Sequence, residues 1–262
     1  MIVVSDFSEK KLVDLLEPEM RVLIDFRHGL GDMVMFMPLL KRLRSMFPDC
    51  AFDMRLLPGR QTPIFHSQHE PIATYDMVAI LRFEESCDKK GFMTKAEYCC
   101  KHELGIPFSE NLDFTWAPQA VTSSLVGVNF QCNSNPAYNV PYGVAEVIWQ
   151  MVQTAGLVPI EIYFEHKQFD RRNQPYNFVT ATTRGVKPSV EAFVGVLQQC
   201  RGFIGVNSGS LCMAMAMYPE RTLHLHTRHD LGYYTKNSKV TTVNATREFL
   251  IQVQSNVGCT TL

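Results

Sequence analysis

Short apolar runs that each end in a turn and lead into an amphipathic segment recur along this chain, and this rhythm constrains its fold most. The first run is Arg21–Phe26, followed by the turn His28–Asp32 and the amphipathic segment Met33–Phe47. Apolar side chains recur in that segment at helical spacing, and its cations lie mostly on the opposite face. Strand, turn and helix in this order predict a parallel α/β sheet with right-handed crossovers.

The same rhythm continues to the C-terminal half. Further strands are predicted at Ala51–Leu57, Met77–Phe83, Leu125–Phe130, Pro159–Phe164, Gly202–Val206 and Arg221–His226. Further helices are predicted at Pro141–Ala155, Ser189–Cys200, Ser210–Met217 and Thr246–Gln254. The stretch Thr115–Ser124 is typical of a linker, and Pro58–Tyr75 reads only as loop. We therefore expect two α/β domains in tandem, residues 1–120 and 121–262, rather than one continuous sheet.

Composition excludes several classes of protein. The chain has 262 residues, 46% of them hydrophobic and 19% charged, with a formal net charge of −1. Such a chain is neither disordered nor drawn as a whole to nucleic acid or membrane. It has no apolar run of membrane-spanning length, and Met1–Asp6 lacks the pattern of a signal peptide. A cytoplasmic protein is expected, with its cysteines as free thiols and no bound metal.

Two turns carry residues suited to chemistry, because open parallel sheets bind ligands beyond the carboxyl ends of their strands. The first is Gly29-Leu30-Gly31-Asp32, with Arg27 and His28 bordering it. The glycines allow a sharp turn and the close approach of another molecule. Asp32 would lie near a helix N-terminus, where it either caps the helix or accepts a proton from an acceptor hydroxyl.

The second turn follows the predicted strand Gly202–Val206. Exposed N–H groups and the helix dipole would make the start of the next helix an anion site, suited to a diphosphate. Its candidate residues are Asn207, Ser208, Gly209 and Ser210. A plain joint capped by Asn207 is the alternative. Asn133 and Ser134, in the loop after another strand, could bind the same phosphates, and Glu165 could bind ribose hydroxyls.

Three segments resemble the heptosyltransferase-type glycosyltransferases. Gly29 to Leu40 with Arg44 to Asp49 resembles the opening turn and helix of that family, and Cys200 to Gly209 resembles its donor-phosphate turn. Val126 to Pro141 resembles the strand and loop of its donor domain. The resemblance covers about Arg21–Pro48 and Leu125–His226. It implies the GT-B fold, two Rossmann-like domains facing each other across a cleft, with the acceptor on the N-terminal side and the nucleotide-sugar donor on the C-terminal side.

The resemblance also implies roles for single residues. Asp32 matches the proposed catalytic base, Ser208 and Gly209 match the donors that hold the diphosphate, Ser134 matches a hydroxyl near the phosphates, and Glu165 matches a ribose-binding acid. The chain departs from the family at three positions. Asn207 replaces Asp, Cys212 replaces His, and Tyr138 replaces a lysine. These departures alter how the leaving diphosphate is neutralised, so the donor or acceptor can differ from those of the best-known members.

The expected function is inverting transfer of a sugar from a nucleotide-diphosphate donor to an acceptor hydroxyl. Metal independence is expected because the chain has no Asp-x-Asp pair, and no cofactor is expected beyond the donor. A bacterial-type glycan is the favoured acceptor, and the protein is expected to be a monomer. Hydroxymethylated DNA is an alternative acceptor, suggested by Lys89, Lys90, Lys95 and Lys101. A nucleotide-sugar epimerase and a non-catalytic nucleotide-sugar-binding protein are further alternatives.

Overall fold

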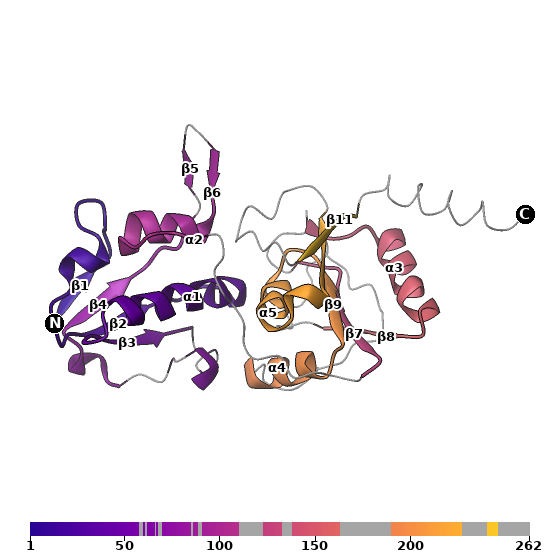
Figure 1. Ribbon diagram of the computed structural model, residues 1–262, viewed down its shortest axis with the longest axis horizontal. Coiled ribbons are helices and arrows are strands. Elements are labelled where there is room, and N and C mark those ends of the chain that lie inside the picture. The colour runs from indigo at the N-terminus through magenta and orange to yellow at the C-terminus, as the bar shows by residue number, and fades with distance from the viewer. Residues whose placement is uncertain are drawn as a thin grey trace, which may run out of the picture. The chain divides into compact units, whose positions relative to one another are not determined.

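The computed structural model divides into two compact units, each with its own parallel sheet (Figure 1). It describes residues 1–57, 60, 62–65, 67, 70–84, 86–88, 91–109, 123–132, 138–162, 190–226 and 240–245. The first unit is built mainly on residues 1–109, and the second mainly on the described residues from 123 onward. The predicted parallel α/β class is therefore confirmed.

The sheet of the first unit has the strand order β1-β4-β2-β3, and all its pairings are parallel. The strands are β1 (Ile2–Val4), β2 (Arg21–Asp25), β3 (Ala51–Arg55) and β4 (Met77–Ile80). β2 lies in the interior of the sheet, and four of its five residues are buried, as expected for a strand covered on both faces. Because the strands are parallel, the turns that follow them gather at one edge of the sheet.

Helices cover this sheet and shape its edge. α1 (Leu30–Met46) begins three residues earlier than predicted because Gly29, in extended conformation, is its N-cap. α2 (Lys95–Tyr98) continues without a break into the π-helix η4 (Cys99–Leu104), and α1 contacts α2. The remaining elements of the unit are short: η1 (Leu12–Leu15), η2 (Pro63–Phe65), η3 (Ile72–Thr74), and the hairpin β5 (Ser86–Asp88) with β6 (Gly91–Met93).

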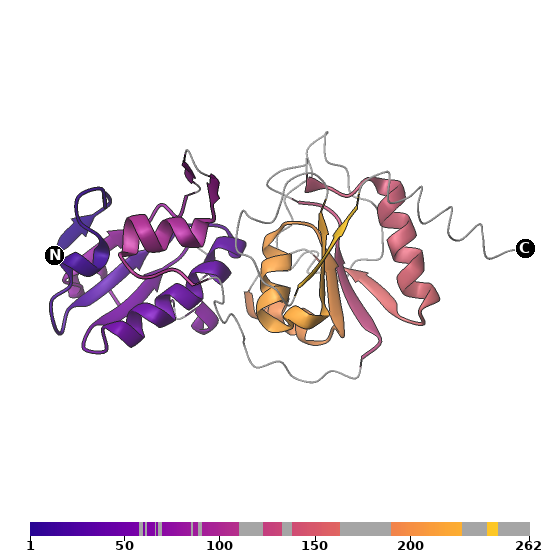
Figure 2. The ribbon, with the colours of Figure 1, turned by 45° about the horizontal axis from the view of Figure 1, so that its top comes forward.

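The sheet of the second unit has the order β11-β10-β9-β7-β8, again entirely parallel. Its strands are β7 (Leu125–Asn129), β8 (Val158–Glu161), β9 (Gly202–Gly205), β10 (Thr222–His226) and β11 (Thr241–Asn244). Its helices are α3 (Tyr142–Thr154), α4 (Val190–Gln198), α5 (Gly209–Met217) and the short η6 (Pro219–Arg221). Figures 1 and 2 show α3 and α5 on opposite faces of this sheet. The centre of the sheet is therefore buried on both sides.

The predicted elements that fall on described residues are confirmed, with ends that shift by up to about three residues. The predicted helix Thr246–Gln254 and most of the predicted linker Thr115–Ser124 lie outside the described residues, so the boundary at residue 120 remains a prediction. The stretch read only as loop contains η2 and η3. The other elements that were not anticipated are β1, η1, β5, β6, α2, η4, η6 and β11. β1 has three residues, too few to show a period.

A glycine allows β9 to lie close to the chain that enters β10. A Cβ atom added at Gly202 would lie 2.7 Å from the carbonyl oxygen of Arg221, a backbone atom that cannot move away cheaply. Gly195, within α4, would meet nothing within 4 Å and has no positive φ. Adding a side chain should therefore destabilise the fold at Gly202 but not at Gly195.

We predict that Gly202→Ala lowers the free energy of unfolding by about 1–3 kcal/mol, because the added methyl group overpacks the strand joint. Gly195→Ala is expected to leave stability unchanged or to raise it by up to about 1 kcal/mol, because alanine favours a helix more than glycine does. Urea denaturation of both variants measures the two values. Equal stabilities for the two variants would contradict the packing at Gly202.

Candidate functional site

The residues that follow β2 are held in place at the carboxyl edge of the first sheet. The His28 Nε2 atom lies 2.9 Å from the carbonyl oxygen of Leu81, which follows β4. The guanidinium of Arg60 donates a hydrogen bond of 2.8 Å to the carbonyl oxygen of His28. His28 is half-buried and Arg27 is exposed, and both border the turn as expected. The turn that begins α1 is therefore tied to the ends of both neighbouring strands.

The buried residue Asp25 forms two ion pairs at this edge. Asp25 ends β2, is 6% exposed, and accepts hydrogen bonds from the side chains of Arg27 and Arg55. Burial by itself raises the pKa of Asp25, but the hydrogen bonds from Arg55 and Arg27 outweigh it, so the net pKa is lowered. In the sequence this carboxylate reads only as part of the apolar run Arg21–Phe26, and nothing there marks it as a candidate site residue.

Asp32 lies in the first turn of α1, where the helix dipole favours a negative charge. Gly29 is the N-cap, and no side chain caps this helix. The alternative in which Asp32 caps α1 is therefore wrong. Its Oδ1 atom instead accepts a hydrogen bond of 2.9 Å from Nζ of Lys95, and the two side chains are only 13% and 14% exposed. Gly31 is buried within α1, and Gly29 is exposed.

Lys95 lies in a different environment from the one that its sequence neighbours suggest. In the sequence it belongs to a basic stretch with Lys89, Lys90 and Lys101, yet its side chain is largely buried against Asp32 and comes from another element, α2. Lys101 is exposed, and Lys89 and Lys90 lie outside the described residues. A cation engaged by a carboxylate adds little to a phosphate-binding surface, so the pair weakens the argument for DNA as the acceptor.

α5 begins at the carboxyl edge of the second sheet. Ser208 is the N-cap, and its hydroxyl oxygen accepts a hydrogen bond of 3.2 Å from the backbone N–H of Leu211. The N–H of Cys212 bonds to the carbonyl of Ser208. Within the described part of the chain, the backbone N–H groups of Gly209 and Ser210 have no acceptor. Two N–H groups at a helix N-terminus form a site for an anion.

Two polar side chains lie at this helix terminus, one without a hydrogen-bond partner and one with a partner. The Asn207 side chain is 5% exposed, and its Oδ1 atom is buried without a hydrogen-bond partner. A buried amide oxygen without a partner is costly, so the fold tolerates an unfavourable polar group beside the free N–H groups, and such a group marks a candidate site. The Ser210 hydroxyl, by contrast, accepts a hydrogen bond of 3.1 Å from Nδ2 of Asn129, which ties α5 to the end of β7.

The other expected donor-side residues fall in different places. Cys212 is 1% exposed within α5, and Tyr138 is half-buried and packs against the hydrophobic cluster beneath α3. Asn133, Ser134 and Glu165 lie outside the described residues, so their roles remain predictions. Among the residues that the structure describes, no three His, Cys, Asp or Glu side chains gather as a metal site. None of the described helices combines the length and apolar character needed to cross a membrane.

No protein-family model and no curated protein matches this chain. Solved structures do match it, and several of them are glycosyltransferases. The iron-containing dodecameric glycosyltransferase TibC from enterotoxigenic E. coli H10407 matches with a TM-score of 0.61 and 18% identity, over 88% of this chain. The match spans only 63% of TibC, so this chain corresponds to less than two thirds of that protein.

Two further structures match over nearly their whole length. The family 9 glycosyltransferase from Veillonella parvula gives a TM-score of 0.57 at 11% identity, covering 92% of this chain and 90% of that one. The ADP-heptose LPS heptosyltransferase II of E. coli gives 0.61 at 12% identity, covering 92% and 98%. The resemblance to heptosyltransferase-type glycosyltransferases is therefore confirmed at the level of the fold.

Because Asp25 is ion-paired, the free energy of unfolding should depend on pH in the acidic range. A lowered pKa means that this carboxylate stabilises the fold above its unfolded-state pKa, and that this contribution is lost as the pH falls through the folded-state value. Asp25→Asn is expected to lower the free energy of unfolding by about 3 kcal/mol at neutral pH, because it leaves Arg55 without its buried partner.

The difference between Asp25→Asn and the wild type should shrink as the pH falls below the ordinary pKa of an aspartate and through the lowered folded-state pKa, where the wild-type carboxylate becomes protonated. Urea denaturation across this pH range measures it. Asp49→Asn changes the same group at an exposed position and serves as the control. A stability loss that is independent of pH would contradict the proposed ion pairing.

Proposed function

We propose that this chain is a glycosyltransferase that moves a sugar from a nucleotide-diphosphate donor to an acceptor hydroxyl, with inversion and without a metal ion. We further propose the GT-B arrangement, in which the acceptor-side and donor-side units face each other across a cleft during the reaction. The observation that carries the proposal is the start of α5, with two free N–H groups beside a buried, unpaired amide. The shared fold with solved glycosyltransferases supports it.

The donor end of the proposal follows from charge. A nucleotide diphosphate that leaves from a sugar carries growing negative charge on its terminal oxygens. The N–H groups of Gly209 and Ser210 point into this site with the positive end of the α5 dipole behind them. Asn207 can add a donor through Nδ2, because only its Oδ1 atom is buried without a partner. No side-chain cation is needed for this stabilisation.

The acceptor end of the proposal rests on Asp32. Lys95 occupies Oδ1, which leaves Oδ2 as the oxygen for the acceptor hydroxyl. Oδ2 lies beside Gly29, 3.5 Å from the position that a Cβ would take there, so the absence of a side chain keeps this oxygen accessible. We propose that Lys95 is a positioning residue that fixes the orientation of the Asp32 carboxylate.

The chemical step then balances simply. The acceptor oxygen attacks the anomeric carbon from the side opposite the diphosphate, and its proton passes to Oδ2 of Asp32. The bond between the anomeric carbon and the diphosphate oxygen breaks, and the electron pair leaves with the nucleotide diphosphate. The helix terminus of α5 stabilises that charge through dipoles that are already oriented before the reaction.

The similar proteins suggest where to begin the search for the donor. TibC has been solved with ADP-D-β-D-heptose, and the E. coli heptosyltransferase WaaC with ADP. ADP is therefore the first nucleotide to test with this chain, followed by other nucleoside diphosphates. The favoured acceptor remains a bacterial-type glycan.

We predict that Gly209→Pro weakens ADP binding at least tenfold. Proline is well tolerated at the first position of a helix, and the extended conformation of Ser208 (φ −161°, ψ 165°) is the one required before proline. The substitution therefore keeps α5 but deletes one N–H, and a hydrogen bond to a charged group contributes about 1.5–3 kcal/mol. Gly209→Ala retains the N–H and is the matched control.

The shift of the melting temperature with ADP concentration measures both affinities, because a ligand bound only by the folded state stabilises it. Similar ADP affinities for the Pro and Ala variants would place the diphosphate elsewhere. No ADP-dependent shift in the wild type, followed by none with other nucleoside diphosphates, would overturn the donor assignment.

We predict that Asp32→Asn reduces sugar transfer by about 10²–10⁴-fold, the usual contribution of a general base, and leaves donor binding unchanged. Release of nucleoside diphosphate in the presence of acceptor glycans measures the transfer. Asp49→Asn should retain full activity because that side chain is exposed and away from the edge. An Asp32→Asn protein that binds donor and turns over at the wild-type rate would remove Asp32 from the chemistry.

A further inference from the structure

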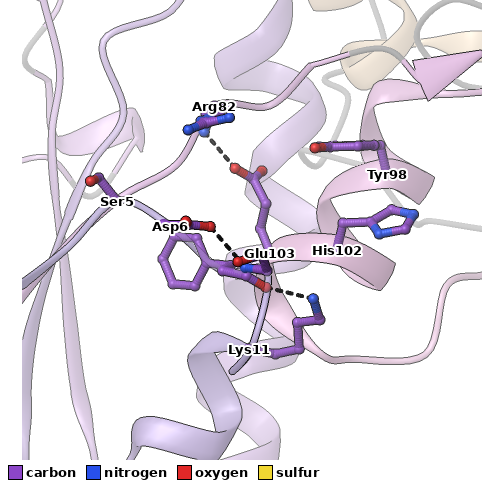
Figure 3. A pocket seen from close by; sticks show the side chains of 9 residues that line it. Ser5, Asp6, Lys11, Arg82, Tyr98, His102 and Glu103 are labelled. Atoms are coloured by element: carbon purple, nitrogen blue, oxygen red, sulfur yellow. Dashed lines mark hydrogen bonds between the residues drawn. The ribbon is translucent and has the colours of Figure 1, made fainter.

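A pocket of about 330 Å³ opens on the first unit (Figure 3), and Asp32 is not among the residues that line it. This volume is at the lower end of the range for small-molecule sites, about 300–1,000 Å³, so the pocket has room for one small ligand. Its lining is mostly polar and comes from three parts of the unit. The lining residues are Ser5, Asp6, Phe7, Ser8, Lys11, Arg82, Tyr98, His102 and Glu103.

The pocket lies at the carboxyl edge of the first sheet. Ser5 and Asp6 follow β1 directly, and Arg82 follows the neighbouring strand β4. Tyr98 and His102 come from the helix formed by α2 and η4. Residues 1–20 supply five of the nine lining residues and precede the segment whose sequence resembles the heptosyltransferase-type enzymes. The N-terminal segment of this chain is therefore needed to form the pocket.

Hydrogen bonds fix the frame of the pocket. The Glu103 carboxylate is 3% exposed and accepts hydrogen bonds from the backbone N–H groups of Arg82 and Phe83, at 2.6 and 3.0 Å. Nζ of Lys11 donates a hydrogen bond of 2.5 Å to the carbonyl of Phe7. Gly105 ends η4 at a φ of +76°, and its missing side chain lets Lys11 pack there, since a Cβ would lie 2.7 Å from that of Lys11. The β1 end, the β4 end and the helix are thus joined.

Several polar groups of the pocket remain available to a ligand. Within the described part of the chain, the Arg82 guanidinium, the Tyr98 hydroxyl and the His102 ring nitrogens have no hydrogen-bond partner. Burial, reinforced by Glu103, raises the pKa of Tyr98, so the phenol is a hydrogen-bond donor at neutral pH. Asp6 accepts a hydrogen bond of 2.9 Å from the N–H of Ser8 on Oδ1, and the Ser8 hydroxyl also interacts with this carboxylate. The backbone and side-chain hydrogen bonds of Ser8 lower the pKa of Asp6, so the exposed carboxylate is an ionised acceptor with capacity for a further hydrogen bond.

The balance of charge favours an uncharged ligand over an anion. Lys11 and Arg82 bring two positive charges, and Asp6 and Glu103 bring two negative charges, so the formal charges cancel when His102 is neutral. The available groups include both donors and a strong acceptor. Hydroxyl groups both donate and accept, so a molecule with several adjacent hydroxyls can satisfy both kinds at once.

The pocket lies close to the proposed catalytic edge. Lys95, which holds Asp32, and the pocket residues Tyr98 and His102 are spaced by three and four residues, which places them along one face of the same helix. Seven residues of helix span about 10 Å. A ligand in the pocket that extends along this face would reach the Lys95–Asp32 pair.

We propose that this pocket is a saccharide subsite that holds a neutral sugar unit of the acceptor, next to the unit whose hydroxyl reacts at Asp32. The assignment of the ligand as acceptor rests on the proposed function, whereas the binding of a sugar in this pocket does not. Asp6 would accept hydrogen bonds from sugar hydroxyls, and Arg82 and Tyr98 would donate to their oxygens.

The test is ligand-observed saturation-transfer NMR on the full chain. The probes are the methyl glycosides of glucose, galactose, mannose and N-acetylglucosamine, with inorganic phosphate as the anionic probe. Tyr98→Phe removes only a hydroxyl, and Asp6→Asn changes an exposed carboxylate, so at least one variant should fold even if the other does not. Asp49→Asn is the matched control outside the pocket.

At least one glycoside is expected to bind the wild type and the Asp49→Asn protein, and to bind about fivefold or more weakly to Tyr98→Phe or Asp6→Asn, the effect of one lost hydrogen bond of about 1 kcal/mol. Saturating ADP should leave this binding in place. The proposal is overturned if no glycoside binds, if both pocket variants bind like the wild type, or if phosphate or ADP displaces the glycoside. The glycoside experiment needs no nucleotide-sugar donor. A negative result in it is therefore independent of the outcome of the ADP experiments.

Discussion

The parallel pairing of the strands is the constraint on which the rest of this structure depends. In each sheet every strand ends at the same edge, so each turn after a strand adds residues to one shared surface. This explains why residues as distant in sequence as Asp6, Asp32 and Arg82 come from one edge of one sheet. It also explains why the candidate anion site at α5 lies at the corresponding edge of the other sheet. The topology of the two sheets therefore determines where the candidate sites lie.

At the edge of the first sheet, the ion pair between Lys95 and Asp32 fixes the carboxylate that is the candidate base. A surface ion pair contributes little, but this pair is largely shielded from water and joins the start of α1 to α2. It occupies one oxygen of the carboxylate and leaves the other beside Gly29. The helix that supplies Lys95 also lines the pocket at the end of β1. One helix thus connects a candidate proton acceptor to a candidate sugar subsite.

Local signals in the sequence were sufficient for much of the fold. The run that became β2 and the segment that became α1 show their periods clearly, and so does the turn into α5. The sequence could not reveal contacts between distant segments. Lys95 reads as one of several surface lysines, and only the folded chain shows that it reaches Asp32, 63 residues away. β1 is too short to be detected, so the pocket that it helps to form was invisible as well. Asp32 was singled out correctly as a residue of the edge, but its alternative role as a helix cap was excluded only by the structure.

The central claim is that the start of α5 binds the diphosphate of a nucleotide donor. A crystal structure of the chain with ADP bound tests it most directly, because it shows the position of the phosphates without the need for an acceptor. Phosphate oxygens are expected within about 2.7–3.2 Å of the backbone nitrogens of Gly209 and Ser210. A diphosphate bound at any other place in the chain, with these two N–H groups facing only water, would contradict it.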